Sequence, residues 1–510
     1  MTTRFTDFAP LVLEGNTFFT TPFNSLTEHQ RRIQRYKKFW DFYEGYHWHR
    51  GKETANDFTV TINYIRRIIQ LKVDFLTKNG FDLTIPEDPR NGIDDTTARS
   101  EIKYVLDRQW QKNNKESWLT EYAETGAITG DVFVRVSWDS RNNFVRNDIL
   151  PSHYVFPEWD LIDRTRMRVC HIIYPEIDFT EPTSRGGFRF RSSDLRKLKD
   201  RRVIWHRETW TDEKVERYKD DQLVKEEPNL FGEIPIVHVR NVPNGNSHYG
   251  ISDVEDLISL QRQYNEKSTD ISDIIEYHGS PLTILFGARV EDLERGPDKV
   301  WGLPEGANAK NLELTSDLKA SLDFLQLLYR SMLDLAGVPE QAINPVRNVS
   351  NTPGVALHMA YLPLIDNRRK KILYYGTGLR QINRLMLKVL EIARPEQVLS
   401  ELNKRGDDRY ETEVSFGEAL PRDESLEIDK QQSMLSMGMT TRKDELVRMG
   451  KGEKDAERII KEADEERMKL AQIDAQAAGG SDDEIFGKRR RPDPVAQGDK
   501  VSQPRPKVQE

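Results

Sequence analysis

Cysteine is almost absent, because Cys170 is the single cysteine in 510 residues. One thiol can form neither a disulfide within the chain nor a cysteine-cluster zinc site, so we expect a reducing compartment. No apolar run approaches the roughly 20 residues that span a bilayer. Residues 1–7 also lack a basic region followed by an apolar core. We therefore expect neither a membrane span nor a secretory signal.

Positive charge is not in excess either. The chain carries 76 Lys and Arg residues against 84 Asp and Glu residues, which gives a net charge of -8. Proteins that grip DNA phosphates along their surface are usually basic, because each phosphate contact uses a cation. Any role with nucleic acid must therefore be local, or must avoid tight binding. At 37% hydrophobic and 31% charged residues, the composition predicts a water-soluble protein of roughly two to four domains.

Local signatures of catalysis are missing as well. The sequence has no Walker motif, no H-E-x-x-H, no G-x-S-x-G and no dinucleotide fingerprint. Gly245 and Gly250 have the spacing of a phosphate-binding loop, but Ile251 stands where the essential lysine must be. His47 and His49 are two residues apart without a carboxylate–histidine pattern, which is more typical of ordinary histidines than of a metal site. We expect no enzyme, no metal and no cofactor.

The first half of the chain combines helix and strand patterns. Ser25 and Glu28 form a capping box that opens the first helix, and Asn79-Gly80 is a C-cap signal for the second. From Asp131 onward the pattern becomes β-branched and aromatic with partial alternation. We predict an α+β domain over 1–250 with a mostly antiparallel sheet. The predicted helices are 25–43, 63–78, 97–112 and 116–127, and the predicted strands are 131–138, 154–156, 169–174, 203–211, 215–218 and 236–240.

Two long amphipathic helices are predicted at the centre of the chain. In 251–278 apolar residues recur every three or four positions, and the opposite face is acidic; 316–336 repeats the apolar stripe before Gly337 and Pro339 stop it. Between them, 279–315 has strand-like and turn residues, as in 281–286 and 300–304. This pattern predicts a stalk with a small module at its tip.

The remainder is a loop, a long helix, a helical region and a tail. Residues 341–354 are rich in Asn, Pro and Ser and read as a long loop, which is often functional. A very long helix is predicted over 355–394, kinked by Pro363. Shorter helices continue to 475, with Thr441-x-x-Asp444 as a capping pattern, and 476–510 has the composition of a disordered tail. The tail's basic run, 488–491, fits a nucleic-acid contact, an import signal or, by default, a solvated tail.

In this order the elements resemble the portal proteins of tailed double-stranded DNA bacteriophages, in the branch similar to the portal of Bacillus phage SPP1. The passages that carry the resemblance are YGISDVEDL at 249–257, QYNEKSTD at 263–270, NVSNTPGVAL at 348–357, SFGEALPRD at 415–423, GMTT at 438–441 and the acidic 453–467. The likeness covers 25–475. One departure is Thr352-Pro353, where relatives often have Ser-Gly, and this stiffens the loop.

The resemblance implies a portal fold and assigns a role to each segment. Residues 1–250 and 355–394 would be the wing, 251–278 and 316–340 the stem, 279–315 the clip, 341–354 the tunnel loop and 395–475 the crown. The implied stem residues are Glu255, Arg262, Glu266, Lys267, Asp270 and Asp273. The implied DNA-facing tunnel-loop residues are Asn344, Arg347, Asn348, Ser350, Asn351 and Thr352. The implied clip residues that dock the motor and the adaptor are Arg289, Glu291, Asp292, Glu294, Arg295 and Trp301.

The resemblance also implies partners and a location. The chain would form a ring of about twelve copies around double-stranded DNA. It would meet the terminase large subunit, the major capsid protein and scaffold, and the head–tail adaptor, but no membrane. It would be assembled in the host cytoplasm and stay in the virion, at one capsid vertex. Acidic helices, if they line the channel, would keep DNA centred by repulsion.

Other functions fit the sequence less well. A packaging ATPase or nuclease would need a Gly-rich loop with Lys, or a carboxylate cluster that binds two metals. Another capsid or scaffold component would assemble without a channel, and a host helical adaptor is the third alternative. A ring with a central hole separates the portal from all of these.

Overall fold

The computed structural model describes most of the chain. It describes residues 23–48, 59–87, 96–163, 165–177, 203–279, 283–286, 308–311, 318–343, 354–405, 409–418, 433–438, 440–444, 457–465 and 468–469. The chain divides into two units, Met1–Ala419 and Leu420–Glu510. The predicted helical region 395–475 is therefore shared between the two units.

Helices surround a small sheet in the first unit. The sheet has the order β3-β2-β9 and is antiparallel throughout, with β2 (Asp131–Asp139) in the middle, β3 (Phe144–Leu150) on one side and β9 (Ile236–Arg240) on the other. Both neighbours pair with β2, so its Val132, Val134 and Val136 are fully buried. The helices of this unit are α2 (Phe23–Glu44), α3 (Tyr64–Thr77), α4 (Thr96–Lys112), α5 (Lys115–Thr129), α7 (Ile258–Gly279), α8 (Leu318–Ala336), α9 (Glu340–Ile343), α10 (Gly354–Ala393) and α11 (Pro395–Asn403).

The helix α3 shows how the sequence sets these elements. Asn63 caps its start, since its side chain accepts the N–H of Arg66 at 3.0 Å. Apolar residues then follow at helical spacing, and each of them is buried. These are Ile65, Ile68, Ile69, Val73 and Leu76. The predicted helix over 63–78 is thus confirmed, with its stripe facing the core.

A second antiparallel sheet has five strands in the order β4-β5-β6-β7-β8. Its last two strands are joined at Asp220 and Asp221, which both have positive φ (45° and 69°), as a tight hairpin turn requires. The predicted antiparallel pairing is correct, but the strands form two sheets rather than one, and β3 and β8 were not predicted. The strands are β4 (Val155–Trp159), β5 (Met167–Ile177), β6 (Val203–Trp210), β7 (Lys214–Lys219) and β8 (Gln222–Pro228).

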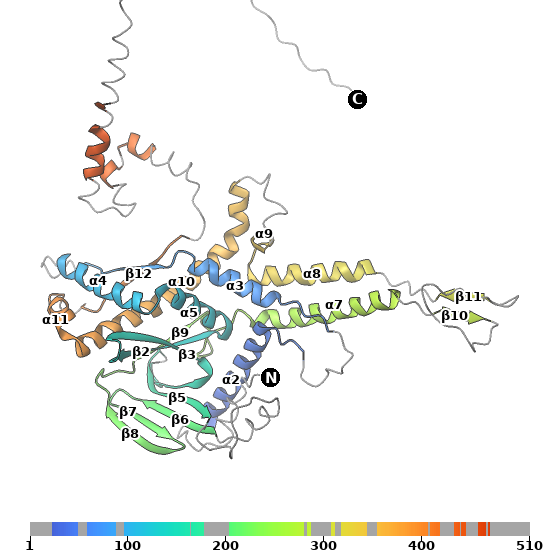
Figure 1. The fold of residues 1–510 in the computed structure, drawn as a ribbon, viewed down its shortest axis with the longest axis horizontal. Coiled ribbons are helices and arrows are strands. Elements are labelled where there is room, and N and C mark those ends of the chain that lie inside the picture. The colour runs from blue at the N-terminus through green and yellow to red at the C-terminus, as the bar shows by residue number, and fades with distance from the viewer. Residues whose placement is uncertain are drawn as a thin grey trace, which may run out of the picture. The chain divides into compact units, whose positions relative to one another are not determined.

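The longest helix, α10, spans 40 residues and contains Pro363. Figure 1 shows it changing direction in its N-terminal part and then crossing the unit. Its C-terminal half packs on β2 and β9 and buries Tyr375, Leu379, Ile382 and Leu390 almost completely. The helix α11 packs against α10 and α4, and β12 (Glu413–Phe416) pairs with β1 (Phe81–Thr84).

In the second unit, Asp444 accepts hydrogen bonds from both the N–H and the hydroxyl of Thr441, so the predicted cap is confirmed. Residues 457–465 are helical. They are tied to residues 440–444 by Arg442–Asp464 (3.0 Å) and Lys443–Glu457 (2.7 Å). These contacts hold the described parts of this unit together.

Candidate functional site

A helical hairpin formed by α7 and α8 is the most distinctive feature of the first unit. The two helices pack side by side and lead to the antiparallel pair β10 (Thr283–Phe286) and β11 (Asn308–Asn311) (Figure 1). The ring of Tyr64 lies 5.1 Å from that of Tyr264 and 4.9 Å from that of Tyr329, so positions 264 and 329 lie at the same level. Thr283 pairs with Asn311.

The hairpin begins later than predicted. Helix was expected from Ile251, but the chain forms a 3-10 turn at Glu255–Leu257 and becomes α-helical at Ile258. The reason is that the preceding backbone is bonded elsewhere: Ile251 donates its N–H to Val242 at 2.8 Å, and Asp253 donates to Ala127 at 2.9 Å. Of the strand-like residues predicted in the tip, 281–286 contains β10 (Thr283–Phe286). Residues 300–304 lie outside the described residues, and β11 (Asn308–Asn311) was not predicted.

Burial divides the hairpin into two halves. Near the base, Leu328, Met332, Leu333 and Ala336 of α8 are buried, and so is Tyr264 of α7. Further out, Ile275 is 58% exposed and Leu322 49% exposed, although both belong to the predicted apolar stripes. The stripes are thus covered only at the base, and the outer half presents apolar side chains that the chain itself does not bury.

The predicted acidic face of 251–278 is exposed on α7, but the prediction was wrong for Asp253, whose side chain is buried. Glu266, Asp270 and Asp273 are exposed, and steps of about 100° per residue align them within about 60° of one another. Lys267 donates to Asp270 at 2.6 Å, and this hydrogen bond raises the pKa of Lys267. We call Glu266, Asp270 and Asp273 the acidic stripe.

Two of the predicted stem residues, Glu255 and Arg262, are not part of the acidic stripe and contact α2. Glu255 pairs with Arg35 of α2 at 2.7 Å. Arg262 is half-buried, and its guanidinium lies 5.6 Å from the ring centre of Phe42. Glu255 and Arg262 therefore help to hold the hairpin to the rest of the unit.

A buried carboxylate anchors the base of the hairpin. Asp253 accepts from Lys72 of α3 at 3.0 Å and from Lys371 of α10, and all three side chains are at most 10% exposed. Burial alone would raise the pKa of Asp253, but Lys371 and Lys72 hold it well below its usual range. Burial lowers the pKa of Lys371 to about 8, although Asp253 acts in the opposite direction. One acidic group thus joins α3, α10 and the hairpin.

A second buried carboxylate fixes the link that precedes the hairpin. Asp131 accepts from Tyr36 at 2.6 Å, from His238 at 2.7 Å and from the N–H of Gly250 at 2.8 Å. A Cβ on Gly250 would lie 2.2 Å from the carbonyl oxygen of Gly130, so this position requires glycine. The former candidate phosphate loop around Gly250 is therefore a close backbone crossing.

Two amides on α7 bind the chain segment that leads into α3. Gln261 accepts from the N–H groups of Tyr64 (2.9 Å) and Ile65 (3.2 Å) and donates to the carbonyl of Ile62 at 2.6 Å. Asn265 accepts from the N–H of Ile62 at 3.2 Å. Both amides are buried. These bonds satisfy backbone groups that would otherwise be buried without partners.

Sequence reasoning missed most of these anchors. Gln261 falls within the apolar stripe of 251–278, and a polar residue within such a stripe is the signal that was available. Asp253, Lys72 and Lys371 lie far apart in the sequence, and no local pattern links them. The amide nitrogen of Asn265 donates to Nδ1 of His47 at 2.6 Å, and Nε2 of His47 donates to the carbonyl of Phe42 at 2.9 Å. His47 is therefore a buried histidine whose two ring nitrogens are both bonded within the protein.

The other predicted site residues lie outside the described part of the chain. These are the tunnel-loop residues Asn344, Arg347, Asn348, Ser350, Asn351 and Thr352, and the clip residues Arg289, Glu291, Asp292, Glu294, Arg295 and Trp301. The first residues of the predicted loop are helical, since α9 covers Glu340–Ile343. Within the described residues, no group of three or more His, Cys, Asp or Glu side chains is placed to hold a metal ion. In that same part of the chain, no helix is long and apolar enough to cross a membrane.

Comparison with known proteins gives a family model that matches most of the sequence. The model of the family described as "Phage portal protein, SPP1 Gp6-like" matches residues 24–469. No curated protein matches the chain. A chain of the structure "Virion of native gene transfer agent (GTA) particle" is similar at 11% identity and a TM-score of 0.41, over 76% of this chain and 89% of that one. A chain of "Neck of empty GTA particle computed with C6 symmetry" is similar at 12% identity and a TM-score of 0.41, over the same shares.

Proposed function

Because the chain belongs to the SPP1 Gp6-like family of phage portal proteins, we propose that its copies form a ring of about twelve around a DNA channel. The ring stands at one vertex of the capsid, where the terminase motor packages double-stranded DNA through it and the DNA later leaves. The family match over 24–469 carries this conclusion. The protein is a structural component of the virion, and the motor supplies the energy.

Within this function the hairpin is the stem. The residues between β10 and β11 form the clip, with Arg289, Glu291, Asp292, Glu294, Arg295 and Trp301 facing the terminase and later the head–tail adaptor. Residues 344–353 form the tunnel loop beside the DNA. In this loop, weak contacts with the sugar–phosphate backbone of the DNA are made by Arg347 and its neighbours Asn344, Asn348, Ser350, Asn351 and Thr352. The wing is made of α2 to β9 together with α10, and it faces the capsid protein and the scaffold.

Exposed apolar side chains support a ring. Ile275, Leu322 and Leu327 of the hairpin are 49–59% exposed. On α10, Met359 and Leu373 are 64% and 63% exposed. A cyclic assembly repeats one heterologous contact until the ring closes, and it covers such surfaces on every copy.

The width of a helix limits how the hairpins stand in the ring. Twelve helices about 10 Å wide surround an opening of roughly 30 Å, whereas twenty-four leave roughly 65 Å. A duplex about 20 Å across is guided only by the narrower opening. Each copy therefore contributes one helix to the inner wall, and the other helix lies behind it.

We assign α7 to the inner wall because of its charge. The acidic stripe is exposed on α7, and α7 carries four acidic residues against Arg262 and Lys267. On α8, Leu327 and Leu335 are exposed instead. A wall without excess cations makes few phosphate contacts, so DNA slides in either direction with little counterion release.

Electron microscopy of the purified chain tests the proposal. We expect rings with a central hole. A second capsid or scaffold component would give shells, filaments or compact monomers, and any of these outcomes overturns the portal function. An ATPase assay on the same preparation separates the ring from a motor, which would hydrolyse ATP.

A further inference from the structure

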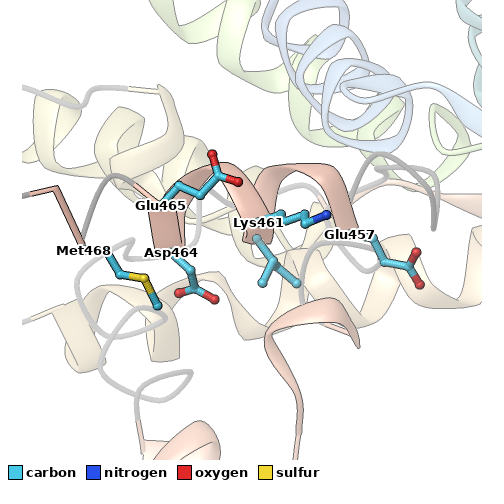
Figure 2. A pocket seen from close by; sticks show the side chains of 6 residues that line it. Glu457, Lys461, Asp464, Glu465 and Met468 are labelled. Carbon is cyan, nitrogen blue, oxygen red and sulfur yellow. The ribbon is translucent and has the colours of Figure 1, made fainter.

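The helix 457–465 in the second unit borders a hollow that the portal role does not use. The hollow has a volume of about 370 Å³, and its lining runs along one face of this helix to Met468. Figure 2 shows Asp464 and Met468 projecting to the same side of the helix. The lining residues are Glu457, Ile460, Lys461, Asp464, Glu465 and Met468.

The hollow combines an apolar floor with a mainly acidic rim, in which three carboxylates (Glu457, Asp464 and Glu465) outnumber the one cation, Lys461. Ile460 and Met468 supply the apolar surface, and Met468 is 69% exposed. Glu457 and Asp464 pair with Lys443 and Arg442, but each of these side chains is 38–63% exposed. Exposed ion pairs contribute only about 0–1 kcal/mol, so another cation can replace either partner.

The chain itself contains a segment that matches this chemistry. Ile485 and Phe486 are adjacent apolar residues, and Lys488-Arg-Arg-Arg491 follows them after Gly487. Residue 485 comes 16 positions after residue 469, at the edge of the hollow. A flexible chain of about that length spans roughly 22 Å, and such a tether holds its end at a millimolar effective concentration. Even a weak contact is then occupied.

We propose that the segment 485–491 docks on its own chain in this hollow. Ile485 and Phe486 cover Ile460 and Met468, and the basic run lies along Glu457, Asp464 and Glu465. This inference goes beyond the portal function and does not depend on it.

Docking changes what the basic run is available for. A free run of four cations binds DNA phosphates without sequence preference. When it lies on the acidic rim, it is withheld from DNA, and this suits a chain whose DNA must keep moving. In the docked state, the protein's own acidic side chains therefore keep the basic run of the tail from binding DNA.

Disulfide trapping in the full-length chain tests the contact. Cys170 is buried, and burial raises the pKa of its thiol to about 12, so it does not compete. In the double variant Met468→Cys with Phe486→Cys, we expect mild oxidation to link the two positions within one chain, read by peptide mass spectrometry. The matched control is Ala463→Cys with Phe486→Cys, because Ala463 is exposed but does not line the hollow. The linkage should form about tenfold faster in the first variant than in the control.

Three results overturn the inference. Equal rates in the two variants show a tail without a preferred site. Unchanged rates after Lys488–Arg491 are all replaced by Gln show that charge plays no part. Linkage between chains in a mixture of the two single-cysteine variants shows that a neighbouring copy fills the hollow.

DNA binding gives an independent readout. Removing the acidic rim with Glu457→Gln and Asp464→Asn releases the tail, so affinity for a random duplex should rise about threefold at low salt. The same change should have no effect in a full-length chain whose basic run is replaced by Gln. An unchanged affinity in the first case contradicts the masking, whatever the images of the ring show.

Discussion

At the scale of single residues, this protein is held by a few buried charges. Asp253 joins Lys72 and Lys371, and Asp131 joins three donors at the entry to the hairpin. Buried charges are expensive unless they are paired, and removing one partner leaves the other without compensation. Substitutions at Asp253 and Asp131 should therefore lower the stability of the fold far more than substitutions of exposed charges such as those of the acidic stripe.

Replacing Asp253 with Asn should destabilise the fold strongly. Lys72 and Lys371 would remain buried without their counter-charge, a loss of about 3–5 kcal/mol in the free energy of unfolding. Urea unfolding measures it. The control is Asp270→Asn, an exposed change that should stay within about 0.5 kcal/mol; similar losses in both variants would contradict the anchoring role.

A second prediction concerns acid. Burial, and to a smaller extent Arg32, lowers the pKa of His153 to about 4, so the folded state holds this ring neutral. Between about pH 6.5 and 4 the unfolded chain binds a proton that the folded chain does not, so stability falls as the pH falls. Relative to strongly acidic solution, the neutral His153 ring adds about 3 kcal/mol to the free energy of unfolding, and this contribution is fully present above pH 6.5.

The variant His153→Phe should flatten this pH dependence. Urea midpoints at pH 7 and pH 4.5 measure the slope in both proteins. If the variant loses as much stability as the parent chain over this range, another group is responsible for the acid response.

At the scale of elements, the two halves of the hairpin have different roles: we expect the base to stabilise the fold and the outer half to take part in the proposed assembly. Its base is part of the hydrophobic core, whereas its outer half exposes apolar side chains. The two helices therefore contain positions of both kinds on one short stretch. This permits matched substitutions only a few residues apart.

Met332→Ala should cost the isolated chain about 2–5 kcal/mol, because Met332 is fully buried. Leu327→Ala, on the same helix, should leave unfolding within about 0.5 kcal/mol, since Leu327 is 59% exposed. Leu327→Ala should instead weaken assembly, measured as the fraction of rings in analytical ultracentrifugation. Rings that form equally well would remove Leu327 from the contact between copies.

At the scale of the whole molecule, the charge balance bears on the proposed passage of DNA. A net charge of -8 and an exposed acidic stripe on α7 disfavour a firm grip. Phosphate contacts by cations would slow the passage of DNA in proportion to their number. The protein therefore fits a conduit better than a clamp.

Replacing the acidic stripe with lysine should make the proposed channel bind DNA and slow its passage. Rings that carry Glu266→Lys, Asp270→Lys and Asp273→Lys should bind duplex DNA more tightly, with a slope of log affinity against log salt that is steeper by about 0.9 for each phosphate contacted. Fluorescence anisotropy with a short duplex measures both quantities. An unchanged slope would place α7 away from the inner wall.

Local patterns in the sequence were enough to predict many of the helices and the family. Helical spacing located α3, α7, α8 and α10, because an apolar stripe reports which face of a helix is buried. The order of weak passages from 249 to 467 indicated a portal protein, and the family match over 24–469 agrees with it. Exposed acids on α7 were also predictable, since a helix that buries one face exposes the other.

How these elements are joined could not be predicted, because it depends on contacts between distant segments. Asp253, Lys72 and Lys371 are separated by more than 100 residues along the chain, so no local pattern announces their contact. The tertiary backbone bonds of Ile251 and Asp253 delay the start of α7, and no local pattern announces the close backbone crossing of Gly130 and Gly250. Local propensity acts over a few residues, whereas burial and charge pairing depend on which distant segments the fold brings together.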